Sequence, residues 1–214
     1  MGKIRWFAPL ALAAALGACG SSGGEAGSEA EAAPEAGTAP ATSMLSQPAC
    51  EPSGNMELEG RTSPYDSTTV DVGEGVAKLC YGRPMLRGRT MIGGDAVPYD
   101  TLWRTGANEP STIHLNVPAT IAGMEVAAGS YSLYTVPRVG DAWTLIVNRS
   151  TSQWGHESQY TPEVRDQEVG RAPVRHEAID TTVEQLTFRP MEAGGGLVLE
   201  WQNSRVHIPI EPRG

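Results

Sequence analysis

The chain has 214 residues, of which 40% are hydrophobic, and it carries a formal net charge of −9 at pH 7. This acidic balance argues against a nucleic-acid-binding protein, because non-specific affinity for nucleic acid comes from a basic surface. The length is sufficient for one domain that folds around its own core without a metal ion or a dense set of disulfides.

Residues 1–18 have the pattern of an export signal. Lys3 and Arg5 make a short positive segment, and residues 6–16 form an apolar run. A helix needs about 20 apolar residues to span a bilayer, so this run is too short to be a membrane span. It fits the apolar core of a secretory signal, with small residues following it.

The end of this segment, Leu16-Gly17-Ala18-Cys19, resembles the lipobox of bacterial lipoproteins. The resemblance implies cleavage before Cys19 and attachment of lipid to that cysteine, whereas the alternative is an ordinary secretory signal with an incidental cysteine. Gly20, rather than aspartate, follows Cys19, which favours the outer membrane over the inner one. We therefore expect a lipid-anchored protein of the bacterial cell envelope, facing the periplasm or the cell surface.

Residues 19–48 are expected to be a disordered linker. After Cys19 they are almost entirely Gly, Ser, Ala, Glu, Pro and Thr. Such a segment has too little apolar surface to offset the entropy lost on ordering. Its fully extended length is about 95 Å, so it would hold the folded domain, residues 49–214, away from the lipid surface.

The rest of the chain shows the period-two alternation of apolar and polar residues that is typical of β-strands. Residues 123–126 and 131–136 are predicted to pair as a hairpin, with Gly129 in the turn, and the last two strands as another about residues 203–204. A short helix is expected only within residues 158–167. Strands are expected at 76–81, 112–117, 123–126, 131–136, 143–147, 183–188, 197–201 and 206–210.

This pattern predicts an all-β fold. Many short strands separated by Gly- and Pro-containing turns are typical of a single β-sandwich or jelly-roll-like domain. No helical periodicity of 12 or more residues follows the export signal.

Cys50 and Cys80 remain as a pair if Cys19 carries lipid. An exported protein meets an oxidising compartment, so a disulfide between them is expected. It would close a loop of about 31 residues and contribute about 3–4 kcal/mol in the chain-entropy model. The alternative is two unrelated thiols.

Strong catalytic and metal-binding motifs are absent from the sequence. It has no nucleophile elbow, phosphate-binding loop, dinucleotide fingerprint or zinc-protease motif. No metal site and no cofactor are predicted, because the four histidines are isolated from one another: His114, His156, His176 and His207.

Several segments of the chain resemble the DUF2911 family, whose function is unknown. They are "YGRPMLRGR", "VPYDTLWRTGANE", "AAGSYSLYTVP", "WTLIVN" and "WG", in this order from about residue 63 to residue 210. The resemblance implies an exported or lipid-anchored bacterial protein and supplies no catalytic residues.

The segment from residue 82 to residue 111 alternates weakly and reads as a long irregular connection. Such loops are usually functional or well braced. In a structural interpretation, Trp103 plugs the core and Asn108 holds a left-handed turn. Arg104 then binds backbone carbonyl groups or pairs with Glu109.

A functional interpretation places Arg83, Arg89 and Arg104 together at one end of the domain, with Asn108 and either Tyr81 or Tyr134. Guanidinium groups bind carboxylates and phosphates in a two-point manner, so this cup would take an anionic small molecule, a glycan or a peptide.

A hydrolase-like enzyme is a further alternative, with Glu109 as the base and His156 as an assisting group. A structural role with an envelope protein as partner also stays open, and catalysis is the least favoured of these functions.

Overall fold

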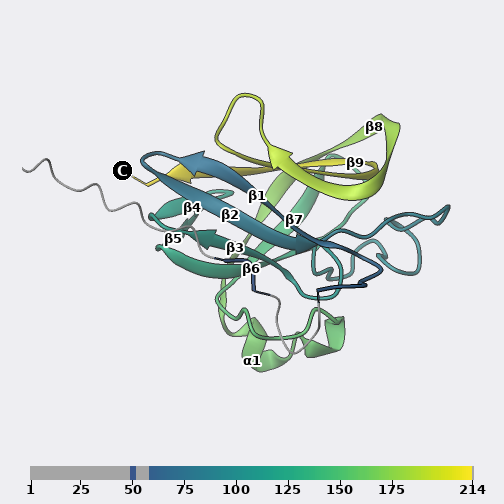
Figure 1. The fold of residues 1–214 in the computed structure, drawn as a ribbon, viewed down its shortest axis with the longest axis horizontal. Coiled ribbons are helices and arrows are strands. Elements are labelled where there is room, and N and C mark those ends of the chain that lie inside the picture. The colour runs from purple at the N-terminus through teal and green to yellow at the C-terminus, as the bar shows by residue number, and fades with distance from the viewer. Residues whose placement is uncertain (1–48, 52–57, 214) are drawn as a thin grey trace, which may run out of the picture. The chain divides into compact units, whose positions relative to one another are not determined.

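The computed structural model describes residues 49–51 and 58–213. In these residues the chain is nearly all β, with nine strands in a single antiparallel sheet, which confirms the predicted fold class (Figure 1). No helix in the described part is long and apolar enough to cross a membrane. The predicted export signal, Cys19 and the linker lie outside the described residues.

The strands alternate between buried and more exposed positions, as the sequence period predicts. One short α-helix, α1 (Pro162–Arg165), lies inside the segment 158–167 where a helix is expected, and a 3-10 turn, η1 (Glu157–Gln159), begins one residue before that segment. The strands are β1 (Tyr65–Val72), β2 (Gly75–Gly82), β3 (Ser111–Leu115), β4 (Ala119–Ile121), β5 (Met124–Val126), β6 (Gly129–Val136), β7 (Ala142–Asn148), β8 (Glu168–Pro190) and β9 (Gly196–Pro212).

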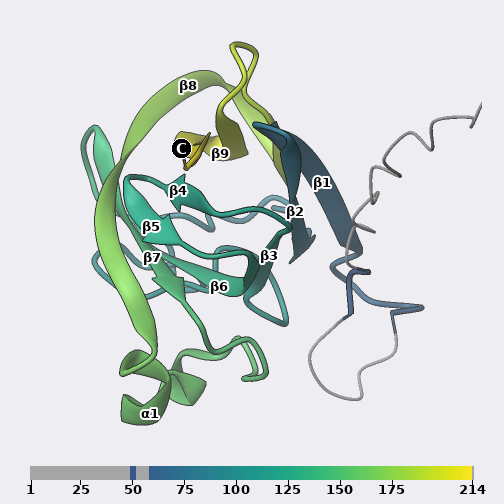
Figure 2. The ribbon, with the colours of Figure 1, turned by 90° about the vertical axis from the view of Figure 1, so that its left-hand side faces the viewer.

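The sheet has the strand order β1-β2-β3-β6-β7-β8-β9-β4-β5 and curls onto itself. Figure 2 shows β8 as a long arc that runs from α1 over β9 toward β1. The residues after β2 pair with the far half of β8, since Leu86 N donates to Glu184 O (2.9 Å) and Leu186 N to Pro84 O (3.0 Å). The curl gives a sandwich-like domain in which opposite parts of one sheet face each other.

Strand β9 reverses direction within its own length. Ile210 N donates to Gly195 O (2.9 Å), which places the two ends of the strand side by side. Gln202 has a φ of 54°, a left-handed value, in the middle of the strand. The two arms of β9 are therefore a hairpin, close to the reversal that the sequence predicts about residues 203–204.

The other predicted hairpin is wrong. Strand β5 pairs with β4, and β6 pairs with β3 and β7 instead. The turn between β4 and β5 consists of Ala122 and Gly123, whose φ values of 48° and 79° suit the tight turn of a two-residue hairpin. A three-residue β4 was too short for its alternation to be recognised.

The interior of the curled sheet holds the hydrophobic core. Trp103, Trp143 and Trp201 are at most 3% exposed and contact one another. Ring centroids are 5.7 Å apart for the stacked pair Trp103–Trp201 and 6.5 Å for the edge-on pair Trp103–Trp143. Aromatic pairs of this kind stabilise a core beyond their buried area.

Cys50 meets Cys80 of β2, and their Cα atoms are 5.6 Å apart. This spacing suits a disulfide. Cys80 is completely buried.

Candidate functional site

The β2–β3 loop (residues 83–110) is held closely between two other segments. A Cβ atom on Gly82 would collide with the carbonyl oxygen of Ala107. On the other side, a Cβ on Gly155 would collide with Asn108 and Arg104, and Gly155 N donates to Asn108 O (3.1 Å). Only glycine permits these approaches, so the sequence around residues 82 and 155 shapes the loop.

Trp103 is the core plug that the structural interpretation predicts. Its indole N–H donates to Gly106 O (3.1 Å), and its backbone exchanges two hydrogen bonds with Thr135 of β6 (2.7 and 2.9 Å). These bonds attach the loop to the sheet at a buried residue.

The residues after Trp103 make a compact turn. Thr105 and Asn108 have φ values of 55° and 67°, so Asn108 adopts the predicted left-handed conformation. Ser111 Oγ donates to Thr105 O (2.8 Å), and Thr105 Oγ1 donates to Thr135 Oγ1 (3.1 Å). The turn is braced by its own side chains.

Glu109 pairs with Arg61 and not with Arg104, which takes the other predicted role and donates to a backbone carbonyl group. Arg61 Nη1 and Nη2 donate to the two carboxylate oxygens at 2.9 and 2.8 Å, and both side chains are at most 3% exposed. The Arg61 guanidinium also lies over the Tyr65 ring, 5.7 Å from its centroid. Burial, together with the Glu109 charge, raises the pKa of Tyr65 to about 12.

This pairing leaves Glu109 poorly suited to be a general base. Both of its oxygens accept from one buried guanidinium. His156 in turn caps η1, because its Nδ1 accepts from Ser158 N (3.2 Å). The Glu109 carboxylate is therefore not free to act as the base that the hydrolase hypothesis requires.

Arg83 and Arg89 are used by the fold. Arg83 binds three partners, with Nε on Leu186 O (3.1 Å), Nη1 on Asp66 (2.8 Å) and Nη2 on Thr187 Oγ1 (2.9 Å). Arg89 donates to two carbonyls of its own loop, Leu86 O (3.1 Å) and Met85 O (3.2 Å).

Arg104 differs from these two arginines. It donates to the carbonyl of Gly155 (3.1 Å), and its Nη1 lies 3.8 Å from the Glu157 carboxylate in a loose ion pair. Its buried Nε has no hydrogen-bond partner among the described residues. Burial lowers the pKa of Arg104, and the Glu157 charge is the main opposing influence. The three arginines of the predicted cup have no hydrogen-bond partner in common among the described residues.

The two tyrosines of the predicted site are buried. The Tyr81 hydroxyl accepts from Phe188 N (3.1 Å), and burial raises the Tyr81 pKa. The Tyr134 hydroxyl accepts from Gln153 Nε2 (2.8 Å), and burial raises its pKa, against a lowering by the nearby Arg104 charge. Of the predicted residues, Tyr134 therefore lies near Arg104, whereas Tyr81 faces β8.

A metal centre has no support in the described part of the chain, where no three His, Cys, Asp or Glu side chains gather.

A family model described as "Protein of unknown function (DUF2911)" matches residues 63–210, which is more than half of the chain. The chain belongs to the DUF2911 family. No curated protein and no solved structure matches it. The DUF2911 region begins just before β1 and ends within β9, so it contains the β2–β3 loop and Arg104.

Sequence reasoning missed two residues that position this DUF2911 loop. Arg61 precedes the family region and holds Glu109 from there. Gln202, at the reversal of β9, accepts from Met91 N (2.8 Å) and Ile92 N (3.1 Å). A polar residue between two apolar strand halves is the one local signal that marks Gln202.

Proposed function

We propose that the protein is a lipid-anchored binding protein of the bacterial cell envelope. Cys19 would carry the lipid, and residues 20–48 would hold the β-domain clear of the membrane. The lipobox-like sequence and the composition of the linker support this placement.

We infer that Arg104 binds an anionic group of a small ligand. The observation that carries this function is the difference between the arginines of the β2–β3 loop. The protein itself uses the Nε, Nη1 and Nη2 of Arg83, whereas Arg104 has one carbonyl partner and a buried Nε without one. A buried donor without a partner is costly, and a bound oxyanion would satisfy it.

The surroundings of Arg104 favour a carboxylate or phosphate as the bound group. The Tyr134 hydroxyl, which accepts from Gln153 Nε2, lies close enough to Arg104 to feel its charge. Glu157 lies beyond hydrogen-bond distance from Arg104 at 3.8 Å, and its side chain is 39% exposed. A ligand oxyanion would displace this loose carboxylate, and Glu157 would swing into solvent.

A thermal-shift titration tests this function. Citrate and inorganic phosphate serve as probes, with sodium chloride at matched ionic strength as the reference. We expect a saturable rise in Tm for the wild type and none for Arg104→Ala, because a ligand that binds only the folded state stabilises it. Arg89→Ala, which removes an arginine bound to its own loop, is the matched control and should retain the rise.

The Glu157→Gln variant distinguishes a ligand-binding role of Arg104 from a purely structural one. Removing the competing charge should strengthen anion binding if Arg104 receives the ligand. Equal Tm values with citrate, phosphate and chloride, combined with a stability loss in Arg104→Ala, would instead assign Arg104 a purely structural role.

A further inference from the structure

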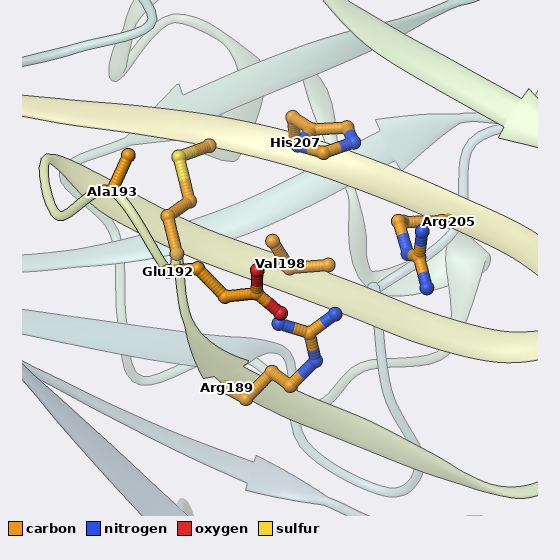
Figure 3. A pocket seen from close by; sticks show the side chains of 7 residues that line it. Arg189, Glu192, Ala193, Val198, Arg205 and His207 are labelled. Atoms are coloured by element: carbon orange, nitrogen blue, oxygen red, sulfur yellow. The ribbon is translucent and has the colours of Figure 1, made fainter.

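A pocket lies on the outer face of β8 and β9, away from the β2–β3 loop. It encloses about 240 Å³. Its basic lining is the two arginines Arg189 and Arg205 and the imidazole of His207, its acidic lining is Glu192, and its apolar lining is Met191, Ala193 and Val198. Figure 3 shows Val198 between Arg189 on one side and Arg205 and His207 on the other.

The fold brings these residues together through the reversal of β9. Arg189 of β8 is the strand partner of Val198 on the first arm of β9. Arg205 and His207 belong to the second arm, which returns beside the first. Residues 191–195 turn back at this end of the hairpin, where Met191 N donates to Gly196 O (3.0 Å).

The floor of the pocket is apolar and shielded. Val198 points outward, between the inward-facing Leu197 and Leu199, yet it is only 3% exposed. An outward-facing valine that is covered in this way gives a small apolar surface inside the pocket. Apolar ligand atoms would gain burial mainly against Met191 and Ala193, which are more exposed than Val198.

Two carboxylates behind the pocket hold its cations in place. Glu200 accepts from Arg189 Nε and Nη2 (both 3.1 Å) and from Arg205 Nε. Glu177 accepts from Arg205 Nη1 (3.1 Å) and lies 3.1 Å from His207 Nε2. Neither glutamate lines the pocket. In the described part of the chain, Arg189 Nη1 and Arg205 Nη2 have no hydrogen-bond partner, so each keeps a donor for a ligand.

We propose that this pocket binds a small monocarboxylate with a short apolar tail. The two fixed guanidinium groups receive the carboxylate, and the tail lies on Val198 and Met191. A volume of 240 Å³ is below the range of about 300–1,000 Å³ that is common for drug-sized ligands, which favours a small molecule over a glycan chain or a peptide. The site does not depend on Arg104.

Benzoate and its uncharged isostere benzamide are the probes for this site. Titration of the labelled protein, followed by the amide resonances of residues 191–198, should give saturable shifts with benzoate and none with benzamide. Arg189→Ala should weaken benzoate binding by about tenfold or more, because charge-assisted hydrogen bonds are lost. Glu192→Gln should strengthen it, since it removes the one acidic side chain that lines the pocket.

Three further variants distinguish benzoate binding in this pocket from binding elsewhere on the protein. Ala193→Leu narrows the pocket from an exposed loop position and should reduce binding without loss of folding. Arg175→Ala removes an arginine that contacts Glu177 from outside the pocket and should bind benzoate like the wild type. Arg104→Ala should also bind normally, which separates this site from the proposed anion site. Equal shifts with benzamide, or equal losses in Arg175→Ala and Arg189→Ala, would overturn the inference.

Discussion

Glu109 shows how the role of one residue depends on a partner far away in the chain. Its carboxylate is almost fully buried, and Arg61, 48 residues earlier, neutralises it with two hydrogen bonds. A charge in such a place is tolerated only when it is paired and hydrogen-bonded. The same feature that makes Glu109 unsuitable as a base makes it important for stability.

Glu109→Gln should lower the free energy of unfolding by about 3–5 kcal/mol, because it removes the negative member of a buried, doubly hydrogen-bonded ion pair. Urea denaturation of the purified domain measures this loss. Glu125→Gln is the matched control, since Glu125 is 63% exposed in its ion pair with Arg213 and should cost less than about 1 kcal/mol. A loss below that level in Glu109→Gln would contradict the bracing role of the buried pair.

Tyr65 makes the free energy of unfolding depend on pH in the alkaline range. Its pKa is raised from 10.0 to about 12 in the folded state, so the folded state holds the proton more tightly. This contribution is complete below pH 10 and is lost as the pH rises toward about 12. Unfolding free energies measured across this window should fall less steeply in Tyr65→Phe than in the wild type. Parallel curves for the two proteins would argue against the raised pKa.

At the scale of elements, the reversal of β9 and the β2–β3 loop support each other. Gln202 sits at the reversal with a left-handed φ of 54° and accepts from two loop amides. Its own Nε2 donates to Ile92 O (3.2 Å). The Gln202 side chain thereby joins the first half of the loop to the turn of the β9 hairpin. The residue before it, Trp201, stacks on Trp103 of the same loop.

Gln202→Ala should lower the unfolding free energy by about 1–3 kcal/mol, because two loop N–H groups lose their acceptor. Alanine keeps the same backbone strain at positive φ, so the loss reports the side chain. Hydrogen exchange at the Met91 and Ile92 amides should accelerate. Gln167→Ala removes an exposed side chain that bonds only Glu163 O and should leave those amides unchanged. Unchanged exchange in Gln202→Ala would show that the loop is held by other contacts.

The elements also show what the sequence could predict. Strands with clear alternation, such as β2 and β7, and the short helix were found, because each is decided by neighbouring residues. Strand β8 was found only at its end, because most of its residues are partly exposed on both faces. The partner of β5 and the partner of Glu109 depend on how the sheet curls, and no local pattern carries that information.

At the scale of the whole molecule, the predictions concern the expected lipid anchor and the way the segment before β1 is attached to the β-domain. The family match covers residues 63–210 and leaves the segments of the expected export signal and linker, together with Cys50, outside it. Cys50 and Arg61 both contact the family region from the preceding segment, at Cys80 and at Glu109. The segment before β1 is thus fastened to the domain at two points.

We expect the Cys50–Cys80 disulfide to form in the exported protein. Reduction should then lower the unfolding free energy by about 3–4 kcal/mol in the chain-entropy model. Alkylation followed by mass spectrometry before and after reduction measures the bond directly. Labelling of both thiols without prior reduction would show that the two cysteines stay free.

Cys19→Ser should release the protein from the membrane fraction, because it removes the expected site of lipid attachment. Cell fractionation of the wild type and the variant measures this difference. Cys50→Ser, which leaves the lipobox-like sequence intact, is the control and should stay in the membrane fraction. Membrane association that persists in Cys19→Ser would contradict the lipid anchor.

The Nε–H resonance of Arg104, observed by NMR during a phosphate titration, tests the central claim most directly. The Arg104 Nε lacks a partner among residues 49–51 and 58–213, whereas Arg83 Nε is bonded to Leu186 O at 3.1 Å. We predict a saturable shift of the Arg104 resonance and a constant Arg83 resonance at matched ionic strength. An Arg104 resonance that stays unchanged, or that moves only as Arg83 does, would contradict anion binding at this residue.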